Sequence, residues 1–367
     1  MTTLVSIAIP AARIDHSELE AHRLRALPVV VISPHNQCDC HCVMCDIWKI
    51  REAEEVSVPQ LGRYITAFRA LGVRWVVFTG GEPQKNRNLP ALAKVLRDEG
   101  IRVTLLTAGL LLETQAEEIA ENVDDVIVSL DGPSALHNRI RRVPEAFERL
   151  ADGVRQLRRR RPNISVKARC TVQKLNHRSL VATAESARNL GLNSISFLAA
   201  DISSTAFNRP SNWSSERQAQ VALDPIEVEE LEAEMQRLIN EHPEDFDSGF
   251  IAESPEKLHR IVQHFRASFG QTEPIAPCCN APWVSAVIEA GGDVRPCFFH
   301  RSLGNTRDLS LEEILNSDAA LQFRASLDIT SDPICRRCVC SLYIPNQETI
   351  DTVPSTGTVQ ATHGGKV

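Results

Sequence analysis

Short apolar runs rich in β-branched residues alternate with longer amphipathic stretches from about residue 27 onward. Each short run is almost continuously apolar, which is typical of a strand that is buried on both faces of a sheet. The alternation continues through six rounds and predicts βα units that build a parallel sheet. The predicted strands cover residues 28–33, 74–79, 102–107, 125–130, 164–172 and 194–200.

Helices are predicted after all but the last of these strands. In the first helix Ser57 can cap the N-terminus, Pro59 fits the opening turn and Gly72 ends it. Because helices connect the consecutive strands, we expect an α/β fold in which the strands curl into a partial (β/α)6 TIM-like barrel. Active-site groups should then gather at the C-terminal ends of the strands. The other predicted helices cover residues 88–99, 113–121, 144–160, 179–190, 225–241 and 254–268.

The composition changes along the chain and predicts several parts. The predicted barrel at 28–210 follows an N-terminal extension at 1–27. A helical linker region is expected at 211–276, and a small cysteine-rich domain at 277–345. The tail at 346–367 is rich in Thr, Gly and Ser and is expected to be disordered.

The 367 residues, 43% of them hydrophobic, are enough to bury a substantial core. The net charge of -7 gives no basis for a broad phosphate-binding surface, so nucleic acid is not an expected partner. The N-terminus lacks the features of a signal peptide, and no apolar run reaches the roughly 20 residues of a membrane span. We therefore expect a cytoplasmic protein without a membrane partner. Eleven cysteines, mostly in two tight groups, favour metal-binding thiolates over a disulfide framework.

The first cysteine group directly follows the first predicted strand. Cys38, Cys42 and Cys45 have CxxxCxxC spacing, which can hold a 4Fe-4S cluster and leave its fourth iron without a protein ligand. Such an open iron can chelate the amino and carboxylate groups of S-adenosylmethionine (SAM). The alternative is a zinc knuckle that also uses Cys40 and His41. The role of Cys40 stays open at this point.

This motif, with MCDIW around its last cysteine, resembles the radical SAM superfamily. The resemblance implies a SAM-binding 4Fe-4S cluster and reductive cleavage of SAM to a 5'-deoxyadenosyl radical. The residue before the third cysteine is usually aromatic in that family, whereas this chain has Met44.

Further polar residues at the predicted strand ends extend the resemblance to SAM binding. Gly80, Gly81 and Glu82 match the family's GGEP element, whose backbone and glutamate receive the SAM ammonium. The two glycines would let the backbone approach a ligand closely. By the same resemblance Ser129, Asp131 and Arg169 contact the ribose and carboxylate of SAM, and the cationic Arg169 suits the carboxylate. A buried salt bridge is the alternative role for Arg169. No catalytic side chain is assigned.

The second cysteine group combines a CNAPW turn, a GDVRPC strand end after a possible hairpin, and a CxxC turn. Four thiolates suffice for a complete auxiliary 4Fe-4S cluster, and the region resembles a SPASM/twitch-type domain. Cys278 or Cys340 could replace one of the four ligands, and structural zinc is the alternative occupant. The assigned ligands are Cys279, Cys297, Cys335 and Cys338.

These features predict abstraction of a hydrogen atom from a small polar metabolite such as a sugar, aminocyclitol or nucleoside, with net oxidation or rearrangement. An external one-electron reductant such as flavodoxin or ferredoxin is expected as a partner. The roughly 27 residues before the first strand are too few for the winged-helix domain of many peptide-modifying relatives. A peptide-modifying maturase of RiPP or cofactor precursors remains an alternative. A non-catalytic iron-sulfur carrier or zinc-braced interaction protein is another, although neither requires GGEP.

Overall fold

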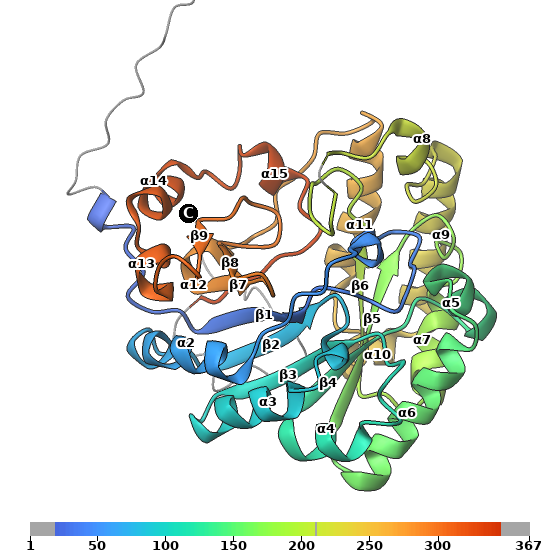
Figure 1. Ribbon diagram of the computed structural model, residues 1–367. Coiled ribbons are helices and arrows are strands. Elements are labelled where there is room, and N and C mark those ends of the chain that lie inside the picture. Colours follow the sequence, from blue (N-terminus) through green and yellow to red (C-terminus); the bar gives the residue numbers. More distant parts are fainter. Residues whose placement is uncertain (1–18, 210, 346–367) are drawn as a thin grey trace, which may run out of the picture.

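The computed structural model describes residues 19–209 and 211–345, so most of the N-terminal extension and the whole predicted tail lie outside the described residues. One sheet of nine strands forms the centre, in the order β6-β5-β4-β3-β2-β1-β7-β8-β9 (Figure 1). Neighbouring strands from β1 to β6 are all parallel, which confirms the predicted βα alternation. These strands are β1 (Val29–His35), β2 (Trp75–Gly80), β3 (Arg102–Thr107), β4 (Asp125–Ser129), β5 (Ser165–Val172) and β6 (Ile195–Ala199).

Helices cover the outer face of this part of the sheet (Figure 1). The first begins as predicted, because Ser57 accepts a hydrogen bond from the Gln60 backbone and Pro59 lies in the first turn. Its Phe68 and Phe78 of β2 are both buried in the apolar core between helices and sheet. The helices are α2 (Val58–Ala70), α3 (Leu89–Asp98), α4 (Ala116–Asn122), α5 (Ser134–Arg141), α6 (Ala146–Arg160) and α7 (Leu180–Asn189).

The region predicted as a helical linker is part of this outer layer. It contains α8 (Ser215–Gln218), α9 (Pro225–Glu241), α10 (Pro243–Asp247) and α11 (Pro255–Ser268). Helix α9 packs against α7 and α11, and α11 packs against β6. The region therefore covers the β6 edge instead of merely joining two domains.

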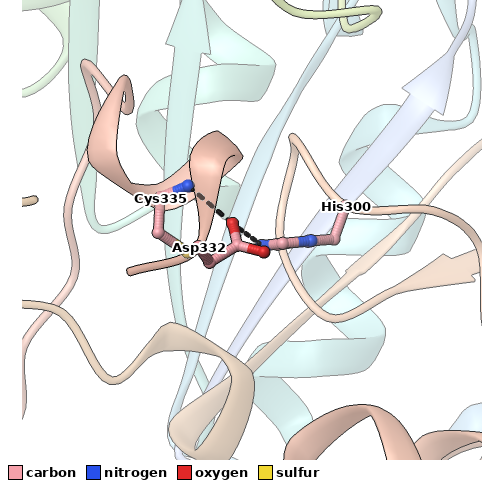
Figure 2. A group of neighbouring side chains, drawn as sticks. All are labelled: His300, Asp332 and Cys335. Carbon is pink, nitrogen blue, oxygen red and sulfur yellow. Dashed lines mark hydrogen bonds and ion pairs between the residues drawn. The ribbon is translucent and has the colours of Figure 1, made fainter. Parts of the chain in front are cut away.

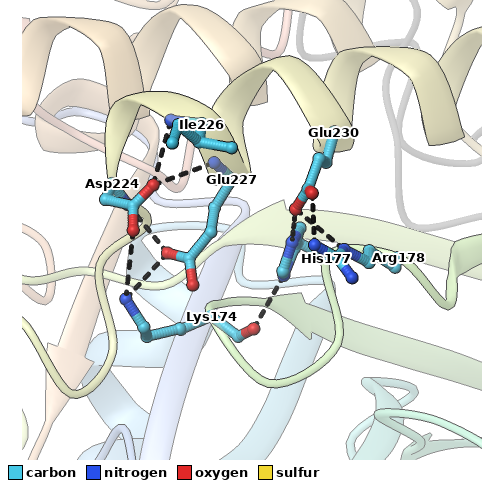
Figure 3. A network of polar contacts seen from close by, with 7 residues as sticks. All are labelled: Lys174, His177, Arg178, Asp224, Ile226, Glu227 and Glu230. Carbon is cyan, nitrogen blue, oxygen red and sulfur yellow. Dashed lines mark hydrogen bonds and ion pairs between the residues drawn. The ribbon is translucent and has the colours of Figure 1, made fainter.

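A polar network fixes the start of α9 to the loop after β5 (Figure 3). Lys174 Nζ lies 2.7 Å from a Glu227 carboxylate oxygen, and Arg178 Nε donates to Glu230 at 2.7 Å. His177 Nε2 is 3.0 Å from the same Glu230 carboxylate. Single exposed ion pairs contribute little, but this shared network specifies where α9 docks.

The C-terminal cysteine-rich part continues the same sheet. Strand β7 (Ser285–Ile288) pairs in parallel with β1, and β8 (Asp293–Arg295) and β9 (Gly304–Asn305) follow in antiparallel pairing. The predicted hairpin is confirmed by β7 and β8, whereas the sequence did not reveal that β7 would extend the barrel sheet. Short helices complete this part: α12 (Ala281–Val284), α13 (Leu311–Leu315), α14 (Asp318–Ser326) and α15 (Pro333–Arg336). None of the helices in the described residues is long and apolar enough to cross a membrane.

Candidate functional site

The first cysteine group lies in the loop between β1 and the short 3-10 helix η1 (Ile47–Lys49). The C-terminal end of α5 holds this loop, because His41 N donates to Arg141 O at 3.0 Å and Val43 N donates to Ile140 O at 3.1 Å. Backbone bonds of this kind fix the loop independently of any bound metal. The loop therefore presents its cysteines at the C-terminal edge of the parallel sheet, where barrel folds place ligands.

The spread of the sulfur atoms distinguishes a cluster from a single ion. A tetrahedral zinc ion with Zn–S bonds of about 2.3 Å needs its sulfurs within about 4 Å of one another. No three ligand atoms of Cys38, Cys42 and Cys45, with or without Cys40 or His41, lie within 4.8 Å of one another. A 4Fe-4S cluster accepts a wider spread because each thiolate binds a different iron. The donor set therefore fits a cluster better than zinc.

Two neighbouring groups, the Cys40 thiol and the Arg141 guanidinium, lower the pKa of Cys42 and so favour its thiolate form. Arg141 Nη1 donates to Cys42 Sγ at 3.6 Å. A hydrogen bond from Cys40 and the charge of Arg141 lower the pKa of Cys42 to about 7, although burial acts in the opposite direction. Cys40 is only 2% exposed, and its hydrogen bonds to Cys38 and Cys42, together with burial, raise its own pKa. This geometry makes Cys40 a thiol donor toward its two neighbours.

Glu82 directly follows β2, and its carboxylate group is buried. This carboxylate is held by several hydrogen bonds. It accepts hydrogen bonds from Thr107 Oγ1 at 2.7 Å, Ala108 N at 2.9 Å and Gln84 N at 3.2 Å. Burial raises the pKa of Glu82, and these hydrogen bonds oppose that effect. No Lys or Arg pairs with it in the part of the chain that the structure describes. A bound ammonium group would supply the missing counter-charge.

The two glycines before Glu82 have a different structural reason from the expected close approach of a ligand. Gly80 has φ +109°, and a Cβ atom there would lie 1.8 Å from Ser33 Oγ. A Cβ atom on Gly81 would lie 2.2 Å from the carbonyl oxygen of Gln37, one residue before Cys38. Both positions therefore need glycine so that the end of β2 can pack against the end of β1. Whether the backbone there also contacts SAM stays a prediction.

The residues predicted to bind the rest of SAM fall into two groups. Ser129 and Arg169 are register partners on β4 and β5, and Arg169 Nε lies 3.5 Å from Ser196 Oγ. Among the described residues no carboxylate forms an ion pair with Arg169, so the alternative salt bridge is absent there. Asp131 instead makes a buried ion pair, with Arg141 Nη2 at 2.6 Å.

Asp131 is thereby connected to the cysteine loop. It is fully buried, and its second carboxylate oxygen accepts a hydrogen bond from Thr171 N at 3.0 Å. Arg141 joins this carboxylate to Cys42 Sγ. Sequence reasoning missed Arg141, because its side chain reaches the site from the end of α5 and no motif marks it.

The loop after β6 packs against the cysteine loop. Arg209 pairs with Asp201 at 2.8 Å and donates to Met44 O at 2.9 Å. Trp213 Nε1 donates to Asp46 Oδ2 at 2.8 Å, and its ring lies 3.7 Å below the Arg209 guanidinium. Met44, which replaces the usual aromatic residue, packs against an apolar cluster that includes Trp213. The loop therefore braces the cysteine segment.

The second cysteine group comes from loops next to β7 and β8 and from α15 and the residues after it. Burial raises the pKa of Cys297 to about 11 and that of Cys335 to about 12, and the nearby thiol groups add to both effects. Binding a metal relieves this cost, because the metal stabilises the thiolates. Cys340 also acts on Cys297 and Cys338, although Cys340 and Cys278 are both exposed. The choice between Cys338 and Cys340 as fourth ligand therefore stays open.

His300 and Asp332 form a compact group with Cys335, one of these cysteines (Figure 2). His300 Nε2 lies 3.4 Å from Cys335 Sγ and 3.9 Å from Asp332 Oδ1. Asp332 caps α15 by accepting from Cys335 N at 2.8 Å. Burial lowers the pKa of His300, so its ring is neutral at pH 7. Sequence analysis missed this residue, although it follows Cys297 by three positions.

Two family models match the chain in the same order as these two sites. Residues 32–187 match the radical SAM superfamily, and residues 278–339 match the SPASM iron-sulfur cluster-binding domain. The chain is therefore an enzyme of the radical SAM superfamily with a C-terminal SPASM domain. These domains imply a SAM-binding 4Fe-4S cluster and auxiliary iron-sulfur binding, as the resemblance predicted.

Curated relatives share only part of their length with this chain. An Fe-coproporphyrin III synthase of Methanosarcina barkeri is 30% identical over 176 residues, which cover 46% of this chain and 44% of that protein. A probable GTP 3',8-cyclase of Archaeoglobus fulgidus is 35% identical over 102 residues, 27% of this chain and 34% of that protein. The chain thus spans less than half the length of these relatives.

Solved structures share the fold over most of the chain. Streptococcus suis SuiB bound to S-adenosylmethionine superimposes with a TM-score of 0.61 at 15% identity, over 89% of this chain and 76% of that one. Native anSMEcpe with bound AdoMet gives a TM-score of 0.62 at 18% identity, over 84% of this chain and 86% of that one. At these identities the likeness concerns the fold alone, and it agrees with the predicted partial barrel.

Proposed function

We propose that this enzyme cleaves SAM reductively at a 4Fe-4S cluster held by Cys38, Cys42 and Cys45, and that the resulting radical abstracts a hydrogen atom from an organic substrate. When bound, such a cluster supplies the electron that breaks SAM into methionine and the 5'-deoxyadenosyl radical. One observation carries the proposal. Three loop thiols, too widely spread for a single ion, lie on the sheet edge that also bears the buried, cation-free carboxylate of Glu82.

The strand-end residues have complementary parts in binding SAM. Glu82 accepts from the SAM ammonium, because the Thr107 and Ala108 donors hold its carboxylate in place. Arg169 pairs with the SAM carboxylate, which is supported by the absence of a close ion pair to Arg169 among the described residues, where Glu253 acts on it only at longer range. Ser129, beside it in register, contacts the ribose, and the backbone of Gly80 and Gly81 contributes to the ammonium site.

We propose that Asp131 does not contact SAM itself but positions Arg141 beside Cys42. The Asp131 carboxylate orients the guanidinium that donates to Cys42 Sγ. Cys40 donates to the same sulfur and is not itself a ligand. Hydrogen bonds to ligand sulfurs are one way in which proteins tune an iron-sulfur cluster.

An auxiliary 4Fe-4S cluster is proposed at Cys279, Cys297, Cys335 and Cys338. A cavity of about 240 Å³, lined in part by Cys338, lies between the chain after β6, α11 and α15. A molecule in this cavity would lie next to the auxiliary cluster, which could accept an electron from a substrate radical. Its size supports a small polar metabolite, such as a sugar, aminocyclitol or nucleoside, that is oxidised or rearranged.

A peptide is the second candidate substrate. SuiB has been solved bound to its precursor peptide SuiA, and anSMEcpe with bound AdoMet and a Cp18Cys peptide. Both candidates need an external one-electron donor such as flavodoxin or ferredoxin, since SAM cleavage consumes an electron. We further propose a cytoplasmic location.

Anaerobic reconstitution tests the proposed function. The wild-type protein should bind about eight irons and form 5'-deoxyadenosine when reduced in the presence of SAM. Cys38→Ala should abolish cleavage and keep the auxiliary cluster, whereas Cys335→Ala should lose iron only at the other site. Bound zinc without SAM cleavage would reject the proposal and favour an interaction protein.

A further inference from the structure

The cavity beside Cys338 lies where a substrate could reach both halves of the molecule. Ile202 and Ser203, just after β6, line one side, and α11 lines another. The rest of the wall comes from Asn212, from Gln218 of α8, from the chain before the SPASM domain and from the end of α15. Helices α11 and α15 lie at the same end of the molecule (Figure 1). Only one cysteine lines the cavity, so it is not the cage of the auxiliary cluster.

The wall of this cavity is strongly basic. Arg260, Arg336 and Arg337 line it, and none of the residues that the structure places on the wall is acidic. Arg336 is already engaged, with Glu273 at 2.9 Å and Pro274 O at 3.1 Å. Within the described residues neither Arg260 nor Arg337 has a carboxylate partner. Two unpaired guanidinium groups at one concavity are suited to bind an anion.

His264 also lines this wall, and one of its ring nitrogens lacks a hydrogen-bond partner. Its ring donates to the Ala200 backbone, while its Nε2 atom is buried without a hydrogen-bond partner in the structure. Burial lowers the pKa of His264 to about 4, so the ring is neutral at pH 7. If Nδ1 carries the proton given to Ala200, Nε2 is left as an acceptor. This atom has almost no accessible surface, so the ring must shift toward the cavity before a hydroxyl group of a ligand can satisfy it.

We propose that this cavity binds a small hydroxylated anion, a polyol that carries a carboxylate or a phosphate. Arg260 and Arg337 pair with the anionic group, and His264 Nε2 accepts a hydrogen bond from a hydroxyl. The inference rests on the proposed function in one respect: the bound anion is the substrate only if the enzyme acts on a small polar metabolite. In that case the cavity narrows the substrate class to anions. Binding itself is independent of that function and can be measured separately.

The arginines have one competing role. A cluster with four thiolate ligands is anionic, and Arg260 lies near enough to Cys338 to interact with its charge. Arginines that only neutralised the cluster would change its iron content or potential and would leave ligand binding unaffected. The test must therefore measure binding and iron content in the same preparations.

Titration calorimetry of the reconstituted, SAM-loaded protein tests the proposal with four probes: gluconate, glucose 6-phosphate, inorganic phosphate and glucose. Either gluconate or glucose 6-phosphate should bind at least about tenfold more tightly than glucose. The one that binds distinguishes a carboxylate from a phosphate ligand. The double variant Arg260→Gln/Arg337→Gln should weaken this binding at least about tenfold. His264→Phe should remove the advantage of the hydroxylated anion over inorganic phosphate.

Arg63→Gln is the matched control, because Arg63 is an exposed arginine on α2, remote from α11, and its loss should leave binding unchanged. Equal binding of glucose and the anions, or undiminished anion binding in the double variant, would overturn the inference. Formation of 5'-deoxyadenosine by the wild-type protein is measured alongside. If it forms while no anion binds, only this inference fails. If anions bind but SAM is not cleaved, the proposed function fails and the binding site stands.

Discussion

At the residue scale, the buried ion pair between Asp131 and Arg141 supports the proposed cluster site at Cys42. Arg141 is almost fully buried, and its guanidinium contacts both Asp131 and Cys42. A buried pair is weak evidence for net stability, because desolvation opposes the attraction. Removing only one partner, however, leaves an uncompensated charge in the interior.

Arg141→Gln is therefore expected to destabilise the metal-free protein by about 3–5 kcal/mol. The measurement is denaturant unfolding of the apoprotein under anaerobic conditions. In the double variant Asp131→Asn/Arg141→Gln no charge is left unpaired, so its loss should be smaller than that of Arg141→Gln alone. Equal losses in the two variants would show that the ion pair does not determine stability here.

His300 gives a second prediction at this scale. In the tautomer that carries its proton on Nε2, His300 would donate a hydrogen bond to Cys335 Sγ and would stabilise the reduced form of a cluster held there, because reduction adds negative charge to the sulfurs. His300→Phe should lower the reduction potential of the auxiliary cluster by about 20–60 mV, equivalent to a hydrogen bond of about 0.5–1.5 kcal/mol. A redox titration followed by electron paramagnetic resonance (EPR), in a Cys38→Ala background, isolates this cluster. An unchanged potential would contradict the assignment, and His22→Phe serves as the control.

Sequence reasoning at this scale identified residue types better than their contacts. The cysteine spacing and Glu82 could be recognised because their motifs are local. The role of Gly81 could not, since its neighbour Gln37 comes from another strand end. Arg141 and His300 were missed for the same reason: their importance depends on sulfurs brought near by folding.

At the scale of elements, the end of β2 supports the cysteine loop directly. Glu82 N donates to Gln37 O at 2.8 Å, and Gly81 leaves no room for a Cβ atom beside that carbonyl. The segment before Cys38 is therefore positioned by the GGEP turn. The two motifs form one structural unit.

Gly81→Ala should displace the segment before Cys38 and lower iron occupancy at the first site by half or more, while the auxiliary cluster is retained. Iron counting and EPR in the Cys335→Ala background measure the first cluster alone. Gly62→Ala is the control, since a Cβ atom there meets nothing within 4 Å and alanine favours the helix by about 0.5–1 kcal/mol. Full iron occupancy in Gly81→Ala would disprove the coupling between the two motifs.

The strands and helices were largely predictable because βα alternation is a local pattern. The strand predicted at 102–107 and the helix predicted at 225–241 agree with β3 and α9 to the residue. Helix α5 was missed because its residues are mostly polar or charged. The pairing of β7 with β1 joins segments roughly 250 residues apart, and no local pattern reports such a contact.

At the scale of the whole molecule, this pairing makes the SPASM domain part of the barrel sheet. Ala286 and Ile288 of β7 are fully buried, and β7 covers the edge of β1. Without β7 that edge would expose unpaired backbone groups and an apolar surface. The SPASM domain is therefore also a structural cover for the β1 edge of the barrel sheet.

A chain ended after residue 276 should accordingly aggregate or lose at least half of its soluble yield, even under anaerobic conditions. Size-exclusion chromatography compares it with the full chain carrying Cys335→Ala, which lacks the auxiliary cluster but keeps β7. Matching monomeric profiles and yields for the two proteins would show that β7 is dispensable.

The central claim is that three thiolates hold a cluster whose fourth iron binds SAM. EPR and electron-nuclear double resonance of the reduced Cys335→Ala protein, with SAM labelled with ¹⁵N at its amino group, test it most directly. The account predicts a changed cluster spectrum on adding SAM and a hyperfine coupling to the label. An unchanged spectrum without coupling, from a cluster already closed by a fourth side chain, would contradict it.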